Sequence, residues 1–343
     1  MKAMIKRELE QSASIISSID PTQVHAIADA MTVALKAGSK VVFFGNGGSA
    51  ADAMHLAAEF NGRYLFDRPA LKALSFCSIS AITAIGNDYS YDDVFCRNVE
   101  SIVQRGDVVV GISTSGSSKN VLKAIRRAKE MGAVTVGFTG IKGALKDETD
   151  LALTIPTDRT PRIQEGYMAA GHVICGLVEN AMFAKKAAFI DRDDTIVKDV
   201  PYCPRPEDLK VFPGVGKAIK RLNDAGYLVI IVTNQSGVAR GKFTEATLAK
   251  IHEKLRADIA AEGGKIDAIY YCPHHPDEGC KCRKPNLGMI ERAIDEHHIS
   301  LGDSFIIGDS AHDVELGKRL GIKAIQVSEG YTFVKAIGDL LKN

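Results

Sequence analysis

Residues 41–49 read VVFFGNGGS, an apolar run that passes directly into a glycine-rich turn. A short apolar run bounded by a turn signal is typical of a strand buried on both faces, so we expect a strand at residues 40–45. Further runs of this kind occur at residues 107–112, 133–138 and 151–155. Helical periodicity marks the first 37 residues, which Pro21 divides into two helices, and residues 162–184. Alternating strands and helices predict a parallel α/β sheet.

A second α/β domain is predicted to follow the first. Buried strands are expected at residues 188–190, 228–233 and 304–307, each ending directly in polar residues. The 343 residues exceed the usual size of one hydrophobic core, no Gly/Ser-rich spacer lies near Lys186, and the halves share no repeat. We therefore expect two different doubly wound parallel-sheet domains, at residues 1–186 and 187–343. Functional groups in such sheets lie at the carboxyl ends of the strands.

The composition limits the partners and the compartment. The 43 basic and 42 acidic side chains nearly cancel, which argues against nucleic acid or an anionic membrane as the main partner. No apolar run reaches the roughly 20 residues of a membrane span, and residues 1–10 are too charged for a secretory signal. We therefore expect a cytoplasmic protein. The seven cysteines are an odd number, and three crowd into one loop, which favours metal ligation over a disulfide framework.

Two loops in the first half are suited to a phosphate group. Asn46, Gly47, Gly48 and Ser49 join a strand to a helix, so that backbone N–H groups and a helix N-terminus can face an anion. Glycine there is equally compatible with close strand–helix packing. Residues 113–118 read STSGSS and offer five hydroxyls before a helix, although capping needs only one. Without a Walker lysine, the pair of loops favours a sugar phosphate over a nucleoside triphosphate.

Four residues on two predicted helices form the candidate centre of the first half. His55 and Glu59 lie four residues apart beside the first loop, and Gln164 and His172 lie eight apart on a later helix. Each pair alone is compatible with a structural role. Together they supply acid/base groups or four metal-compatible ligands, and an aldose–ketose isomerase needs proton transfer between adjacent carbons. Glu59 and His172 are the expected acid/base pair.

The first half resembles a known enzyme family. GNGGSAADAMHLAAEF, AITAIGNDYSYDDVF, GISTSGSSKNVLKAI and RIQEGYMAAGHVICGLVE are similar to phosphoheptose isomerases of the SIS fold, which act on sedoheptulose 7-phosphate. The resemblance implies substrate contacts from Asn46, Gly47, Gly48, Asn87, Asp88, Ser113, Thr114, Ser115, Ser118 and Gln164. It also implies zinc (Zn2+) at His55, Glu59, Gln164 and His172, although four protein ligands leave little open coordination. Family members resemble tetramers with active sites between subunits, which implies a homo-oligomer.

The second half opens with two carboxylates at a strand tip. Asp191 and Asp193 follow the strand at residues 188–190 with one residue between them. Phosphoryl transfer through an aspartyl-phosphate needs a nucleophile and a nearby proton carrier, so Asp191 is the expected nucleophile and Asp193 the general acid/base. An acidic turn that caps a helix is the alternative.

Three later segments carry the polar groups that this chemistry needs. The Thr233 hydroxyl and the amides beside Asn234 can hold phosphoryl oxygens, and Arg283 and Lys284 supply cations. Asp309 follows the strand at residues 304–307, and its hard carboxylate oxygens suit Mg2+. In order and type these segments resemble the four motifs of haloacid dehalogenase-like phosphatases. That resemblance implies Mg2+ at Asp191, Asp309 and the Asp193 carbonyl, with Asp313 in a supporting role.

A cysteine-rich loop precedes the basic pair. Cys272, His274, Cys280 and Cys282 form a C-x-H-x5-C-x-C pattern, which is enough for a closed, structural tetrahedral zinc. Three reduced surface cysteines close together by chance are the alternative. The family pattern selects His274 over His275. A zinc loop at this place resembles heptose 1,7-bisphosphate phosphatases and, less closely, histidinol phosphatases. The family usually has glycine where this chain has Asp194, and aspartate tolerates the left-handed conformation.

The two resemblances together imply a bifunctional enzyme of nucleotide-activated heptose biosynthesis. Its activities would be the first and third steps of the pathway, because a kinase adds the 1-phosphate between them. One alternative makes the first half a sugar-phosphate sensor that regulates the phosphatase. Another gives the second half histidinol phosphate as its substrate.

Overall fold

The computed structural model describes residues 1–342 and divides the chain into two compact units, Met1–Phe183 and Ala184–Asn343. The sequence placed the boundary after Lys186. The structure places it earlier because Lys185 already belongs to the second unit, where its N–H donates to the His298 carbonyl and its carbonyl accepts from Ser300.

The first unit is a five-stranded parallel sheet with strand order β2-β1-β3-β4-β5. Its strands are β1 (Val41–Gly45), β2 (Ala73–Ser75), β3 (Val108–Ser113), β4 (Val134–Thr139) and β5 (Leu151–Thr154). Its helices are α1 (Lys2–Ser17), α2 (Pro21–Lys36), α3 (Gly48–Asn61), α4 (Ile79–Asp88), η1 (Tyr91–Asp93), α5 (Cys96–Ile102), α6 (Lys119–Glu130), α7 (Leu145–Glu148) and α8 (Thr160–Phe183).

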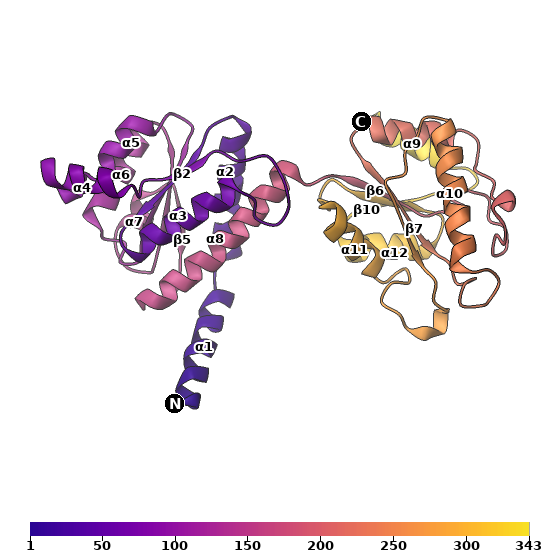
Figure 1. The fold of residues 1–343 in the computed structure, drawn as a ribbon, viewed down its shortest axis with the longest axis horizontal. Helices are drawn as coiled ribbons and strands as arrows, with labels where there is room; N and C mark the ends of the chain where they lie inside the picture. The colour runs from indigo at the N-terminus through magenta and orange to yellow at the C-terminus, as the bar shows by residue number, and fades with distance from the viewer. Residues whose placement is uncertain (343) are drawn as a thin grey trace. The chain divides into compact units, whose positions relative to one another are not determined.

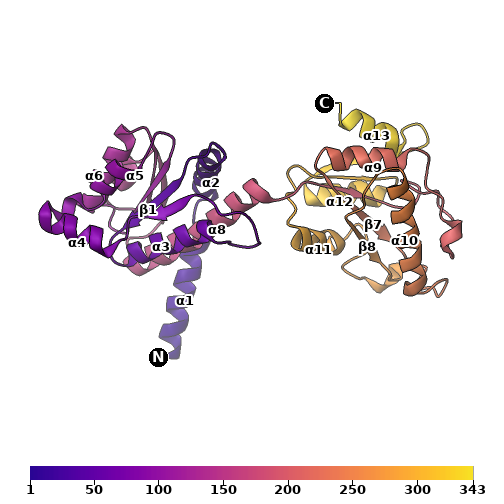
Figure 2. The same cartoon turned by 45° about the horizontal axis from the view of Figure 1, so that its top comes forward.

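Both faces of the first sheet are covered, because successive side chains of a strand point to opposite sides. Val41 and Phe43 pack with α2, α3 and α8, whereas Val42 and Phe44 pack with α5 and α6. The continuous apolar run at β1 is thereby explained. Helix α1 buries none of its residues and projects from the rest of the unit (Figures 1 and 2).

The second unit is another five-stranded parallel sheet, with strand order β10-β9-β6-β7-β8. Its strands are β6 (Ala187–Ile190), β7 (Leu228–Asn234), β8 (Ala268–Cys272), β9 (Phe305–Gly308) and β10 (Lys323–Gln326). Its helices are η2 (Pro206–Asp208), α9 (Val215–Asp224), α10 (Glu245–Ala261), η3 (Pro276–Glu278), α11 (Gly288–His297), α12 (Ala311–Leu320) and α13 (Phe333–Leu340). Helices α9, α10 and α13 cover one face (Figure 2), and α11 and α12 cover the other.

The predicted fold class, two different parallel-sheet α/β domains, is confirmed. Three strands escaped the sequence reading: β2, β8 and β10. Each lies at an edge of its sheet, and none is buried along its whole length. β2 (ALS) and β10 (KAIQ) lack the continuous apolar run on which the prediction depended, whereas β8 (AIYYC) has such a run and was missed. Between residues 1 and 342, no helix is both long enough and apolar enough to cross a membrane.

Candidate active sites

The first glycine-rich loop lies at the carboxyl end of β1 and opens α3. Gly47, the residue before the helix, has φ of 55°, a left-handed conformation that favours glycine. A Cβ added to Gly48 would lie 2.7 Å from Nε2 of Gln164, so glycine here leaves room for that side chain. Ser49 is buried, and its hydroxyl lies 3.0 Å from the Tyr167 hydroxyl. The loop is thus packed directly against α8.

The hydroxyl-rich loop lies at the carboxyl end of β3, the strand beside β1. The Ser113 hydroxyl lies 3.0 Å from that of Ser118 and 3.3 Å from that of Ser115. Ser118 is the N-cap residue of α6, and its side chain caps no backbone N–H of that helix. The three hydroxyls therefore converge at a helix N-terminus, where a phosphate monoester is favoured. Thr114 lies half-buried in the same loop.

A reciprocal pair of asparagines joins the two loops. Nδ2 of Asn46 donates to Oδ1 of Asn120 and Nδ2 of Asn120 donates to Oδ1 of Asn46, both at 2.9 Å. The Tyr91 hydroxyl also donates to Oδ1 of Asn46. Sequence reasoning missed Asn120, the second residue of α6, because its partner Asn46 lies 74 positions away in the sequence. The Asn46 side chain therefore holds the cradle together.

The predicted acid/base residues lie together. His55 Nε2 is 2.8 Å from His172 Nε2 and 3.5 Å from Glu59 Oε1, and the ligand atoms of these three residues all lie within 4.8 Å of one another. His172 also stacks on the Tyr64 ring, with centroids 5.8 Å apart. Such a cluster can move protons or hold a divalent cation.

Gln164 belongs to a separate hydrogen-bond network beside the glycine-rich loop. Its Nε2 donates to Oδ2 of Asp52 at 2.7 Å, and the Tyr167 hydroxyl donates to the same oxygen at 3.0 Å. Burial raises the pKa of Tyr167, which keeps that hydroxyl protonated as a donor. Asp52 was not singled out from the sequence, although it precedes His55 by one helical turn on α3. It fixes the Gln164 amide beside the glycine-rich loop.

Asn87 and Asp88 lie at the end of α4. Both are exposed, and Nδ2 of Asn87 donates to Oδ1 of Asp88 at 2.9 Å. Tyr91 in η1 follows shortly and reaches Asn46, so the segment lies next to the first loop. Their predicted contact with substrate stays a prediction.

A buried ion pair orders the loop that follows Glu59. Arg68 donates from Nε to Oε1 of Glu179 at 2.9 Å, and both side chains are almost fully buried. The Arg68 guanidinium also donates to the carbonyls of Glu59, Phe60 and Gly62 at the end of α3. Glu179 accepts from the N–H groups of Tyr64 and Leu65. Burial raises the pKa of Glu179, but these hydrogen bonds and Arg68 outweigh it and leave that pKa lowered.

Three carboxylates and a lysine form the centre of the second unit. The oxygens of Asp191, Asp309 and Asp313 lie within 4.8 Å of one another at the carboxyl ends of β6 and β9. Lys284 Nζ lies 2.7 Å from Asp191 Oδ1 and 2.6 Å from Asp313 Oδ1. Burial raises the pKa of Asp191, and the Lys284 ammonium opposes that shift. Asp313 also accepts from the Ser310 hydroxyl, so it anchors the lysine and the α12 N-terminus.

Two of the predicted phosphate-holding residues, Thr233 and Asn234, contact Asp193 and Lys284. Thr233 lies at the end of β7, and its hydroxyl is 3.4 Å from Oδ2 of Asp193. Asn234 accepts from the Lys284 N–H and donates to the Lys284 carbonyl, which fixes the backbone of the basic segment. Arg283 is half-buried, and within residues 1–342 its Nη1 has no hydrogen-bond partner. That free donor is suited to an anionic ligand.

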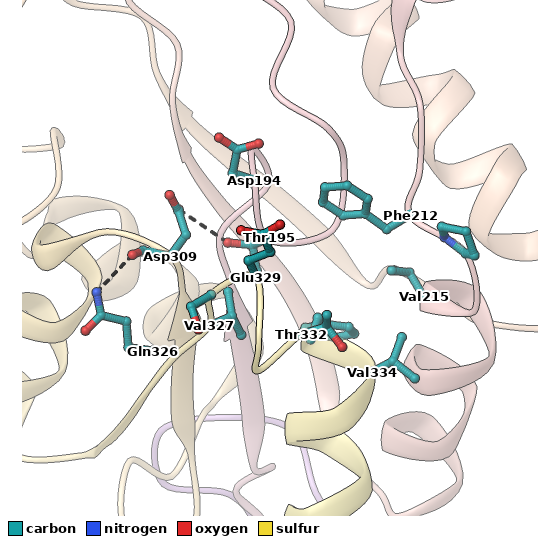
Figure 3. A pocket seen from close by; sticks show the side chains of 13 residues that line it. Asp194, Thr195, Phe212, Val215, Asp309, Gln326, Val327, Glu329, Thr332 and Val334 are labelled. Carbon is teal, nitrogen blue, oxygen red and sulfur yellow. Dashed lines mark hydrogen bonds between the residues drawn. The ribbon is translucent and has the colours of Figure 1, made fainter.

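A cavity of about 880 Å³ opens beside Asp309 (Figure 3). Apolar side chains, including Phe212 and Val334, line one wall, and Asp194 and Asp309 line the other. Asp194 has φ of 49°, as expected for aspartate in a turn that favours glycine, and its Oδ1 accepts from the Asp199 N–H. Its carboxylate is one of the charges that raise the pKa of Asp309, after burial and Asp313.

The cysteine-rich loop is gathered into a compact cluster. The Sγ atoms of Cys272, Cys280 and Cys282 lie 3.3–3.6 Å apart, and Nδ1 of His274 lies 3.2 Å from Cys282 Sγ and 3.6 Å from Cys272 Sγ. These four residues, without His275, form the cluster that could hold a metal. Ligands about 2.3 Å from a tetrahedral centre would be separated by comparable distances.

Comparisons with known proteins agree with this division of the chain. The SIS domain family model matches residues 7–140. Phosphoheptose isomerase from Burkholderia pseudomallei (strain 1710b) is 48% identical over 165 residues, which are 48% of this chain and 84% of that protein. Phosphoheptose isomerase from Solidesulfovibrio magneticus is 53% identical over 161 residues, 47% of this chain and 79% of that protein. The chain belongs to the phosphoheptose isomerase family.

This phosphoheptose isomerase relative carries a second, haloacid dehalogenase-like half. The family model described as HAD-hydrolase-like matches residues 281–339, which contain Lys284, Asp309 and Asp313. The crystal structure of D,D-heptose 1,7-bisphosphate phosphatase from B. bronchiseptica, complexed with magnesium and phosphate, is 33% identical. The match covers 46% of this chain and 98% of the phosphatase chain, with a TM-score of 0.43.

Proposed function

We propose that the chain is a bifunctional enzyme of nucleotide-activated heptose biosynthesis. The first unit isomerises sedoheptulose 7-phosphate to D-glycero-D-manno-heptose 7-phosphate. The second removes the 7-phosphate of D-glycero-D-manno-heptose 1,7-bisphosphate. The observation that supports this proposal most strongly is that each unit carries its own set of reactive groups, Glu59 with His172 and Asp191 with Lys284.

Isomerisation moves hydrogen between carbons 1 and 2 of the sugar through an enediol. In this scheme the two phosphate loops hold the phosphate end of the substrate, and Glu59 and His172, which lie together, act on its other end. One of them removes the proton from carbon and returns it to the neighbouring carbon, while the other transfers the proton between the two oxygens. Asn87, Asp88 and Gln164 would contact the sugar hydroxyls.

Phosphate removal proceeds in two steps. The Asp191 carboxylate attacks phosphorus, the bond to the sugar oxygen breaks, and Asp193 protonates that oxygen. Asp193 then takes a proton from the water that attacks the aspartyl-phosphate and releases inorganic phosphate. Lys284, Thr233 and Arg283 neutralise and hold the phosphoryl oxygens.

The donor sets indicate three metal sites. Asp191, Asp309 and the Asp193 carbonyl offer the hard oxygens that suit Mg2+, which would neutralise charge on the phosphoryl group. Cys272, His274, Cys280 and Cys282 fit a structural Zn2+ without an open position. His55, Glu59, Gln164 and His172 would hold a second Zn2+ in the isomerase unit, where Gln164 would have to leave Asp52.

The first unit also presents apolar side chains suited to self-association. Met4, Ile5 and Leu9 on α1 are all exposed, as are Val173 and Leu177 on α8. Apolar side chains that gather on an exposed helix are suited to a contact with another protein. We propose a cytoplasmic homotetramer assembled through this unit, and sedimentation of the purified protein tests it.

The decisive assay offers the full chain four compounds: sedoheptulose 7-phosphate, both anomers of the heptose 1,7-bisphosphate, and histidinol phosphate. We expect isomerisation of the first and phosphate release from at least one bisphosphate anomer, at rates well above that from histidinol phosphate. Faster release from histidinol phosphate would overturn the phosphatase assignment. Absence of isomerisation, with sugar phosphate binding retained, would favour the sensor function instead.

A further inference from the structure

Arg192, the residue between the two reactive aspartates, holds the second of them. Its Nε and Nη2 donate to Oδ1 of Asp193 at 3.0 and 2.8 Å, and Nη2 also donates to Oδ2 at 3.0 Å. Paired donors from one planar guanidinium fix the direction of a carboxylate as well as its distance. The side chain that must protonate the leaving group is therefore bound by its own neighbour.

The position of Arg192 is itself fixed by the nucleophile segment. Its N–H donates to Oδ1 of Asp191, and its carbonyl accepts from the N–H groups of Ile196 and Val197. The side chain is 3% exposed, against 27% for Asp193. The guanidinium is enclosed by the protein, whereas the more exposed Asp193 carboxylate has room to turn towards solvent. Arg192 is therefore the rigid member of the pair.

Gln235 binds the same carboxylate from the other side. Its Nε2 donates to Oδ2 of Asp193 at 2.8 Å and to the Thr233 hydroxyl at 2.9 Å. Gln235 is buried, and Thr233 is the residue proposed to hold phosphoryl oxygens. Asp193 is thus kept beside the phosphoryl site by two donors on different segments, one after β6 and one after β7.

We propose that Arg192 is a positioning residue of the phosphatase, with Gln235 as its partner, and that together they keep Asp193 directed at the oxygen of the leaving sugar. This inference rests on the proposed function, because it requires Asp193 to be the general acid. Arg192 touches neither substrate nor phosphoryl group in this role. Its loss should impair proton delivery and spare the attack by Asp191.

The test compares leaving groups that differ in their need for a proton. A sugar alkoxide must be protonated as it departs, whereas p-nitrophenolate is weakly basic and departs unaided. The ratio kcat/KM is measured on heptose 1,7-bisphosphate and on p-nitrophenyl phosphate, because it reports the step in which the leaving group departs. The full chain is assayed with Arg192→Gln, Arg192→Lys, Asp193→Asn and the control Arg256→Gln, whose guanidinium bonds the Ile266 carbonyl outside the site.

We expect Arg192→Gln to lower kcat/KM at least about 100-fold on the bisphosphate but less than about 5-fold on p-nitrophenyl phosphate. Asp193→Asn should show the same pattern. Arg192→Lys should restore part of the lost kcat/KM on the bisphosphate. Arg256→Gln should show no difference between the two substrates. Equal losses on both substrates for Arg192→Gln, with a selective loss for Asp193→Asn, would overturn the positioning role. Equal losses for Asp193→Asn would instead overturn the proposed general acid, and the inference with it.

Discussion

The Nε2 atoms of His55 and His172 lie 2.8 Å apart, although the residues are 117 positions apart in the sequence. A neutral imidazole donates from one ring nitrogen and accepts at the other, so this contact requires one of the two Nε2 atoms to carry hydrogen. A divalent cation would instead require a lone pair on both. Glu59 completes the cluster with its carboxylate. Metal binding should therefore replace this hydrogen bond, with the hydrogen carried on Nδ1 of each ring.

The first prediction concerns that metal. His55→Ala should lower the zinc content by about one ion per chain and slow the isomerase by at least about 10-fold, because both the cluster and its geometry are lost. Phosphatase activity should not change. His25→Ala is the matched control, since His25 is an exposed histidine paired with Asp29 on α2. Unchanged zinc content in His55→Ala would contradict a zinc site in the first unit.

The second prediction concerns the cysteine cluster. Cys280→Ala should remove about one zinc ion per chain and lower the thermal stability of the second unit, because structural zinc orders a loop without a core of its own. Metal analysis and calorimetry measure the two effects. Cys77→Ala, at a free cysteine in the first unit, should retain the metal. Equal zinc in the two variants would mean that the loop binds none.

The third prediction concerns the Arg68–Glu179 pair. Glu179→Gln leaves the buried Arg68 charge without its counter-ion, and it should lower the free energy of unfolding of the first unit by about 3 kcal/mol. Glu100→Gln is the control, because Glu100 pairs with Arg127 on the exposed surface and should cost less than about 1 kcal/mol. Urea unfolding measures both. Similar values for the two variants would show that the buried pair contributes no more than a surface one.

The fourth prediction concerns pH. Burial, assisted by the Arg192 charge, lowers the pKa of His252 to about 3. As the pH falls below about 6.5, His252 becomes protonated in the unfolded chain but stays neutral in the folded one. The free energy of unfolding therefore keeps its full His252 contribution above that pH and decreases towards pH 3.

The loss attributable to His252 should reach about 2 kcal/mol at pH 5. His252→Gln should remove that part of the decrease between pH 7 and pH 5 in urea unfolding, whereas the exposed His312→Gln should not. If the pH dependence of His252→Gln matched that of the unaltered protein, His252 would not be the group responsible.

Local sequence patterns predicted the positions of the site residues, but they did not predict which residues make contact across the sheet. Asp191 and Asp193 lie at a strand tip, and the two phosphate loops each follow a buried strand, so position in the sequence determined position at the sheet edge. The Asn46–Asn120 pair, by contrast, joins two loops that only the order of strands brings together. The same holds for Arg68 and Glu179, 111 positions apart.

Residues that position a catalytic or binding side chain were the hardest to predict from the sequence. Arg192 and Gln235 lie beside predicted site residues, but nothing in their spacing indicated that both bind Asp193. Asp52 likewise reads as an ordinary polar position on α3 until Gln164 is folded against it. Side-chain direction and partner identity depend on tertiary packing, which local periodicity does not encode.

The central claim is that one chain carries two independent active sites. It is tested most directly by measuring both activities in parallel preparations of the full chain, Glu59→Gln and Asp191→Asn. We predict that Glu59→Gln loses isomerisation by at least about 100-fold and keeps phosphate release, and that Asp191→Asn shows the reverse. Loss of both activities in either variant, or isomerisation retained in Glu59→Gln, would contradict the account.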